Sequence, residues 1–124
     1  MSAVLDASAV LAFARGERGA DVVDAVLDGA WVAAPNWAEV LAKAAKVGAS
    51  PTELGSLLKA LGVRIEVVAE DDAETAAALA GTNPTLALGD RFCLAVAERL
   101  GLPAYTADRA WRKAVTAARV VDIR

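Results

Sequence analysis

Short apolar runs alternate along the chain with longer segments in which apolar residues recur at helical spacing. The apolar runs predict strands at 3–5, 31–34, 64–68, 104–106 and 119–122. The longer segments predict helices at 8–14, 20–28, 36–47, 51–61, 72–80, 89–100 and 109–116. Such alternation is typical of βα units, so the pattern predicts an α/β fold in which helices cover a parallel sheet.

Two of the predicted helices begin with capping signals. Ser50 offers a capping hydroxyl, Pro51 suits the first helical position, and Glu53 has the acidic side chain that completes a capping box. Asn36 and Glu39 repeat this spacing of cap and acid. The pattern therefore predicts that one helix begins after Ser50 and another at Asn36.

The length and composition favour one small domain spanning residues 1–124. Hydrophobic residues make up 56% of the chain and aromatic residues only 5%, so we expect a core built mainly from Val, Leu and Ala. No apolar run approaches the roughly 20 residues that cross a bilayer. The N-terminal residues lack the basic and apolar regions of a signal peptide. We therefore expect a soluble, cytoplasmic protein without membrane contact.

The absence of certain side chains excludes several chemistries. The sequence has no histidine, which removes imidazole bases, Ser-His-Asp triads and His-ligated zinc. Its only cysteine is Cys93, so an intrachain disulfide and a thiolate metal cluster are also excluded. The net charge of −3 argues against a protein that coats nucleic acid without specificity. Any nucleic-acid contact must be local.

Four acidic residues stand at predicted helix starts: Asp6, Glu39, Asp90 and Asp108. Each has a structural explanation, because an acidic side chain there caps the free backbone amides or complements the helix dipole. What they share is their place, because a parallel α/β fold can gather such positions at the carboxyl end of its sheet. Ligand sites in these folds lie at that end.

Carboxylates gathered in this way repel one another unless a cation lies between them. Oxygen ligands without His or Cys favour Mg²⁺ or Mn²⁺ over zinc. These ions serve phosphoryl transfer, because they activate water and neutralise charge on the attacking and leaving oxygens. The acidic residues thus suggest a metal-dependent enzyme that acts on phosphodiesters.

The segments around the acids are VLDASA at 4–9, NWAEVL at 36–41, LGDRFCLA at 88–95 and YTADRAW at 105–111. Together they closely resemble the PIN-domain ribonucleases, in particular the VapC-like toxins of toxin–antitoxin modules, over essentially the whole chain. The resemblance implies a three-layer fold, with a five-stranded parallel sheet between helices. It assigns the Mg²⁺ or Mn²⁺ site to the four acids Asp6, Glu39, Asp90 and Asp108, with Ser8 and Thr106 as supporting hydroxyls.

The resemblance also implies an activity and partners. VapC-like toxins are endoribonucleases, usually homodimers, that cleave RNA until a cognate VapB-like antitoxin occupies their groove. Basic residues near the acids are candidates for contact with RNA, and they are Arg15, Arg91, Arg109 and Arg112, with Arg18 and Lys113 as further neighbours. Each of them is equally compatible with a solvated helix position or with an ion pair.

One departure from the family and two alternative functions remain open. Many relatives have Ser where this chain has Ala87, so a hydroxyl near Asp90 is missing and the level of activity is in question. The first alternative is a non-catalytic PIN-fold module for binding or dimerisation. The second is an aspartyl-phosphate phosphotransfer protein with Asp6 as nucleophile, although the dehalogenase-type pattern needs a second Asp where this chain has Ser8.

Overall fold

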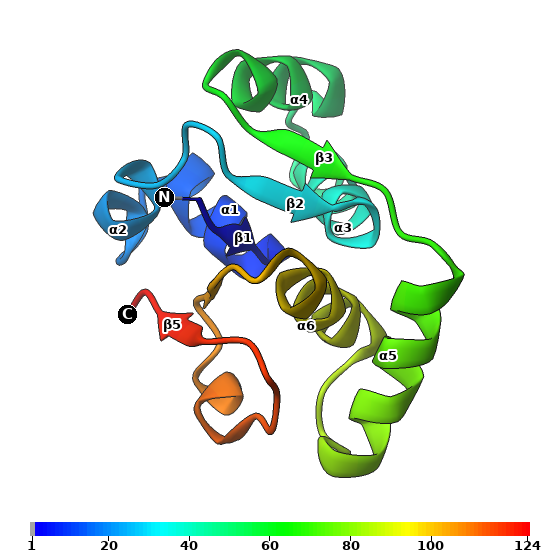
Figure 1. Cartoon of the computed structure of the whole chain (residues 1–124). Helices are drawn as coiled ribbons and strands as arrows, with labels where there is room; N and C mark the ends of the chain where they lie inside the picture. The colour runs from blue at the N-terminus through cyan, green and yellow to red at the C-terminus, as the bar shows by residue number, and fades with distance from the viewer. Residues whose placement is uncertain (1) are drawn as a thin grey trace.

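The strands form one five-stranded parallel sheet in the order β3-β2-β1-β4-β5 (Figure 1). The structure is a computed structural model that describes residues 2–124. The strands are β1 (Val4–Leu5), β2 (Trp31–Ala33), β3 (Arg64–Glu66), β4 (Ala104–Thr106) and β5 (Val120–Asp122). The predicted α/β fold with a parallel sheet is confirmed, and each strand lies within its predicted range.

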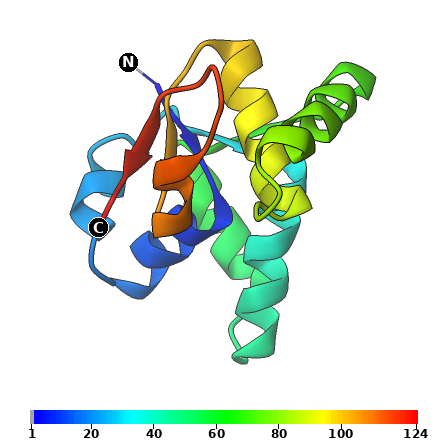
Figure 2. The same cartoon turned by 90° about the horizontal axis from the view of Figure 1, so that it is seen from below.

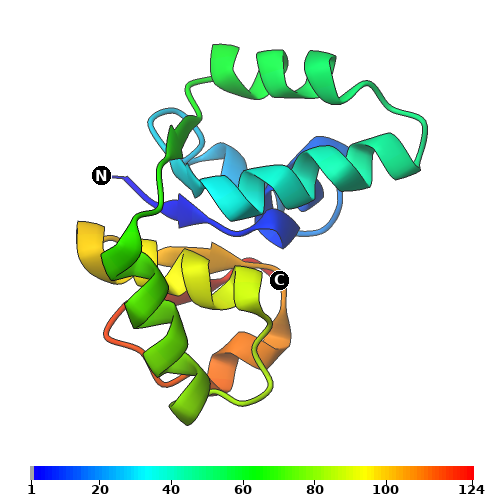
Figure 3. The same ribbon diagram turned by 90° about the vertical axis from the view of Figure 1, so that its right-hand side faces the viewer.

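Helices cover both faces of this sheet. They are α1 (Ala7–Arg15), α2 (Ala20–Asp24), α3 (Ala34–Lys46), α4 (Pro51–Ala60), α5 (Glu70–Thr82), α6 (Leu88–Leu100) and the 3₁₀ helix η1 (Arg109–Lys113). Figure 3 shows α3 and α4 on one side of the strands and α5 and α6 on the other. Across residues 2–124, none of the helices combines the length and the apolar character that a membrane span requires.

The strands divide their side chains between two apolar clusters, because successive residues of a strand point to opposite faces. Leu5 and Val32 belong to the cluster that packs against α1, α2, α3 and α4. Val4 and Ala33 belong to the cluster that contains residues of α5, α6 and η1. Figure 2 shows the same division from below, with α1 and α2 on the opposite side from α5 and α6. The sheet is therefore the middle layer of three.

The predicted cap at Ser50 is present, but the predicted cap at Asn36 is wrong. The Ser50 hydroxyl accepts a hydrogen bond from the Glu53 amide at 3.2 Å. Helix α3 instead begins at Ala34, and Asn36 lies inside its first turn. Pro35 explains the earlier start, because its fixed φ and missing amide hydrogen suit the first turn of a helix. The Asn36 side chain is consequently free for another contact.

Two predicted helices are shorter than expected. The helix predicted at 20–28 ends at Asp24, and turns follow it up to Gly29, whose φ is +83°. The helix predicted at 109–116 is the single 3₁₀ turn η1. Its chain leaves the helical path because the Asn83 side chain bonds the amide and the carbonyl of Val115, at 2.7 and 2.9 Å.

Candidate functional site

The site lies where the order of strands reverses. From β1 the chain proceeds to β2 and β3 on one side of the sheet and returns to β4 and β5 on the other. Leu5 of β1 pairs with Tyr105 of β4, and the amide of Asp6 donates to the carbonyl of Tyr105 at 3.1 Å. Asp6 thus lies beside Thr106 at the carboxyl edge of two central strands, the usual place for a ligand site in open α/β sheets.

Asp6 is buried, and its carboxylate accepts hydrogen bonds from two hydroxyls and a backbone amide. The residue is only 3% exposed to solvent. Its carboxylate caps α1 by accepting a hydrogen bond from the amide of Ala9 at 2.8 Å. The Thr106 hydroxyl donates to Oδ2 at 2.6 Å. The Ser8 hydroxyl lies 2.7 Å from Oδ1 and 2.9 Å from Oδ2. These contacts fix the position of the carboxylate.

The two hydroxyls also hold the loop that carries Asp108. Ser8 Oγ accepts from the amide of Ala107 at 2.9 Å, and Thr106 Oγ1 accepts from the amide of Asp108 at 3.0 Å. Each hydroxyl therefore links the Asp6 carboxylate to the backbone that follows β4. This geometry gives a physical reason for the placement of hydroxyls at these two positions.

Burial raises the pKa of Asp6 from its ordinary value of 3.8 to about 6. The hydrogen bonds from Thr106, Ala9 and Ser8 lower that pKa, but desolvation outweighs them. The charge of Asp90 raises it further. Asp6 therefore lies close enough to a second carboxylate for the two charges to oppose each other.

Asp90 lies in the first turn of α6 and is half-buried. Its Oδ2 accepts from the amide of Ala87 at 3.0 Å. Burial raises its pKa and this hydrogen bond opposes the rise, while the charges of Asp108 and Glu39 raise the pKa and that of Lys43 lowers it. The charges of Glu39 and Asp108 thus act on Asp90, and the charge of Asp90 acts on Asp6.

Glu39 has a partner that sequence reasoning missed. The Asn36 amide group donates to Glu39 Oε1 at 3.2 Å and to the carbonyl of Gly89 at 3.0 Å, so it joins α3 to the start of α6. Asn36 is buried, and its Oδ1 has no hydrogen-bond partner within residues 2–124. A Cβ at Gly89 would collide with Glu39 Oε1. Asn36 and Gly89 thus set the position of the Glu39 carboxylate.

Three of the four acids cap a helix or turn, as the structural explanation of these residues requires. Asp6, Asp90 and Asp108 each accept from a backbone amide near a helix start, in the case of Asp108 from Ala110 at 2.9 Å. Glu39 accepts instead from the Asn36 side chain. Between residues 2 and 124, no group of three or more Asp, Glu or Cys side chains is already arranged to hold a metal ion. Capping and metal binding are compatible, because each capping bond leaves other oxygen lone pairs free.

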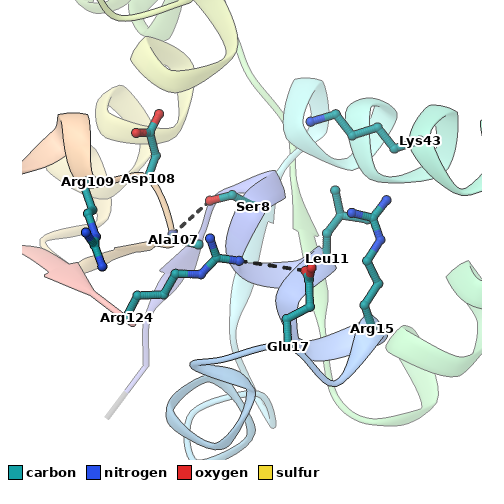
Figure 4. A pocket seen from close by; sticks show the side chains of 9 residues that line it. All are labelled: Ser8, Leu11, Arg15, Glu17, Lys43, Ala107, Asp108, Arg109 and Arg124. Atoms are coloured by element: carbon teal, nitrogen blue, oxygen red, sulfur yellow. Dashed lines mark hydrogen bonds and ion pairs between the residues drawn. The ribbon is translucent and has the colours of Figure 1, made fainter.

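Of the four basic residues proposed to contact RNA, two lie in a cavity beside the acids. Arg15 and Arg109 line a cavity of about 550 Å³, together with Ser8 and Asp108 (Figure 4). The other two have partners within the fold. Arg91 donates to the carbonyl of Ala76 at 2.9 Å, and Arg112 forms an ion pair with Asp122 at 2.6 Å.

The PIN domain model matches residues 3–116, so the chain belongs to the PIN domain family. The family resemblance predicted from the sequence is thereby confirmed. A search of curated proteins found no significant match.

Solved structures share the fold over nearly their full length. A toxin–antitoxin complex from Klebsiella pneumoniae is similar at 23% identity, with a TM-score of 0.81 and 98% of each chain covered. VapBC2 from Rickettsia felis, bound to a promoter DNA fragment, has 10% identity, a TM-score of 0.76 and 98% coverage of each chain. VapC20 from Mycobacterium tuberculosis, a toxin that cleaves the sarcin-ricin loop, has 16% identity and a TM-score of 0.74, with 94% of this chain and 97% of that chain covered. These likenesses confirm the PIN-like three-layer fold.

Proposed function

We propose that this protein is a Mg²⁺- or Mn²⁺-dependent endoribonuclease and the toxin of a toxin–antitoxin pair. The observation that carries the proposal is the Asp6 carboxylate, which is buried at the carboxyl edge of the sheet with a raised pKa and with the charge of Asp90 nearby. Burying one carboxylate near others is unfavourable unless a cation offsets the charge. The PIN family membership and the similar toxin structures support the same function.

The donor set fits a hard divalent cation. Asp6, Glu39, Asp90 and Asp108 offer only carboxylate oxygens, which suit Mg²⁺ or Mn²⁺, and their side chains would have to draw together around the ion. When bound, such an ion would lower the pKa of the water that it binds and would neutralise charge on the phosphate. The protein's part is to hold the four carboxylates: Ser8 and Thr106 orient Asp6, and Asn36 orients Glu39.

The partners follow from the same proposal. Among the similar structures are a toxin–antitoxin complex and VapBC2 on promoter DNA. We propose a VapB-like antitoxin for this chain, a cytoplasmic location and a homodimer. Ala87 contributes its backbone amide to Asp90, so its lack of a hydroxyl leaves that contact in place.

The first prediction concerns cleavage and its products. Purified protein incubated with total RNA and Mg²⁺ should cut the RNA, leaving 5′-phosphate and 3′-hydroxyl ends, because water attacks in line and expels the 3′ oxygen. EDTA should stop the reaction. Asp90→Asn should abolish cleavage while the protein stays folded, and Glu74→Gln, an equal charge change on exposed α5, should cut normally. Mapping fragment ends and measuring circular dichroism give both readouts.

Four outcomes would contradict the proposal. Cleavage that persists in EDTA, or ends that carry a 2′,3′-cyclic phosphate, would exclude the carboxylate metal mechanism. Mg²⁺ binding without any cleavage would favour the non-catalytic module. Covalent labelling of Asp6 by a phosphodonor would favour the phosphotransfer protein.

A further inference from the structure

The cavity beside the acids collects positive side chains from four separate parts of the chain. Arg15 comes from the end of α1, Lys43 from α3, Arg109 from η1 and Arg124 from the residues after β5. In Figure 4, Ser8 lies near the middle of these side chains, with Asp108 and Lys43 on opposite sides of it. The cavity therefore opens directly onto the site described above, and it shares Ser8 and Asp108 with that site.

Most of these cations lack a partner. Arg124 forms one long ion pair with Glu17, at 3.9 Å, and both side chains are solvent-accessible. For Arg15, Lys43 and Arg109, the described part of the chain, residues 2–124, contains no ion pair and no side-chain hydrogen bond. The cavity is thus lined by four cations and two carboxylates, Glu17 and Asp108, in a protein whose overall charge is negative, and the charge of Arg109 also acts on Asp122 outside the lining.

Lys43 connects the cavity with the acids. Its side chain lines the cavity together with Asp108, one of the four acids, and with Ser8, whose hydroxyl contacts the Asp6 carboxylate. The phosphate backbone of a nucleic-acid strand bound across the carboxylates would therefore continue into a cavity lined by positive side chains. Lys and Arg side chains are the usual partners of nucleic-acid phosphates, and Arg binds them with two parallel hydrogen bonds.

We propose that this cavity holds the phosphate of single-stranded RNA next to the one that is cleaved, with Arg15 and Arg109 as its main ligands. The inference rests on the proposed ribonuclease function and names the part of the substrate that the cavity binds. A volume of about 550 Å³ lies within the range of small-molecule sites and leaves room for one nucleotide with its phosphate. Arg15 and Arg109 are positioning residues, because they contact the strand beyond the reacting phosphate.

The test compares two double variants that remove the same charge. Arg15→Ala with Arg109→Ala empties the cavity of two cations. Lys46→Ala with Arg119→Ala removes two exposed cations outside it, and Lys46 closes α3 just as Arg15 closes α1. The Kd for fluorescein-labelled single-stranded RNA is measured by fluorescence anisotropy in EDTA, at several KCl concentrations from about 50 to 200 mM. Affinity that depends on phosphate contacts falls over this range of salt.

The cavity variant should bind RNA roughly tenfold more weakly. In a plot of the logarithm of its association constant against the logarithm of the salt concentration, the slope should be shallower by about 0.7 for each lost phosphate contact. With Mg²⁺ its KM should rise by a similar factor while kcat stays within about twofold, because the carboxylates are unchanged. RNAs shortened on one side of the cleaved bond should erase the defect, and those shortened on the other side should keep it. The control variant should match the wild type in each measurement.

Failure of this inference is distinguishable from failure of the proposed function. If the wild type cleaves RNA and both double variants bind it with the wild-type Kd and salt slope, the cavity has no role and the ribonuclease proposal stands. If the wild type binds RNA through Arg15 and Arg109 without cleaving it, the cavity is an RNA-binding site, but the ribonuclease proposal and the placement beside a cleaved phosphate are excluded. Wild-type protein without measurable affinity for RNA would overturn the cavity inference.

Discussion

The ionisation of Asp6 is coupled to folding, because its pKa is about 6 in the folded protein against 3.8 for an exposed carboxyl. Between these values the unfolded chain has already lost the proton that the folded protein keeps. The unfolded state therefore binds fewer protons there, and the free energy of unfolding falls as the pH rises. The loss begins near pH 4 and is complete above pH 6.

This coupling predicts a pH profile for metal-free protein. In EDTA, the free energy of unfolding should drop by about 3 kcal/mol between pH 4 and pH 7 through Asp6 alone. Asp6→Asn should remove that part of the profile, because the amide does not ionise. Asp24→Asn, at an exposed position of α2, should keep it. Urea unfolding at several pH values measures the difference. Parallel profiles for the wild type and Asp6→Asn would show that the Asp6 carboxyl titrates normally.

A glycine pair tests the placement of Glu39. Gly89→Ala adds a methyl group that collides with Glu39 Oε1, so Mg²⁺ affinity and cleavage should fall roughly 10–100-fold, as for groups that orient metal ligands. Gly81→Ala, in α5, meets no neighbouring atom and should stabilise the protein by about 0.5–1 kcal/mol with normal cleavage. Isothermal titration with Mg²⁺ and an RNA cleavage assay give the comparison. Equal cleavage by both variants would contradict the role of Gly89.

At the residue level, the sequence and the family resemblance proposed the four acids and the hydroxyls of Ser8 and Thr106, but not the contact of Asn36 with Glu39. Asp6, Asp90 and Asp108 are visible because each follows a strand or opens a helix. The sequence predicts a helix cap at Asn36, whereas the structure shows a contact with the carbonyl of Gly89. That contact joins residues 53 positions apart and depends on how closely α3 approaches α6. Local sequence contains no signal for that distance.

At the level of elements, the apolar pattern predicted every strand and most helices, because alternation and helical spacing reflect which face is buried. Its errors fall where tertiary contacts decide. The chain after η1 is extended because Asn83, a residue of another loop, bonds Val115. No pattern within 109–116 indicates this contact.

An ion pair between two helices gives a prediction at this scale. Arg99 of α6 donates to both oxygens of Asp72 at the start of α5, at 2.8 and 3.1 Å, and the Arg99 hydrogen bond lowers the pKa of Asp72. Asp72→Asn should cost about 1–2 kcal/mol of stability at pH 7. Asp71→Asn, the exposed neighbour with the same charge change, should cost less.

The pH dependence of this pair has the opposite sign to that of Asp6. A lowered pKa means that the stabilisation is present above about pH 4 and is lost as the pH falls through the folded value. In urea unfolding, the difference in stability between wild type and Asp72→Asn should therefore shrink as the pH is lowered from about 7 towards about 3. A difference that persists at the lower pH would assign the effect to the capping bond that Asp72 accepts from Ala69.

At the level of the whole molecule, metal binding and folding should be linked. An ion that binds only the folded protein stabilises it by about 2.7 kcal/mol at a concentration 100 times its Kd. Thermal melts should therefore shift upward by several degrees as Mg²⁺ is added to the wild type, and should stay constant for Asp90→Asn. Glu74→Gln should follow the wild type. A melting temperature that ignores Mg²⁺ in the wild type would contradict the proposed metal site.

The order of strands was beyond the reach of the hydrophobic pattern, which predicts strands but not their neighbours. The family resemblance implies five parallel strands without their order, and the structure places β1 in the middle of the sheet with β4 beside it. That neighbourhood brings Thr106 onto Asp6, which explains why residues so distant in sequence belong to one site.

The central place of the first strand has a consequence during synthesis. Asp6 leaves the ribosome before the hydroxyl that holds it, because Thr106 is 100 residues further along the chain. Until β4 has been translated, the nascent polypeptide contains an isolated carboxylate with neither Thr106 nor Asp108 beside it. The Asp6 site is therefore assembled only after the whole segment from Asp6 to Thr106 has been translated, so the proposed cleavage of RNA cannot begin before then.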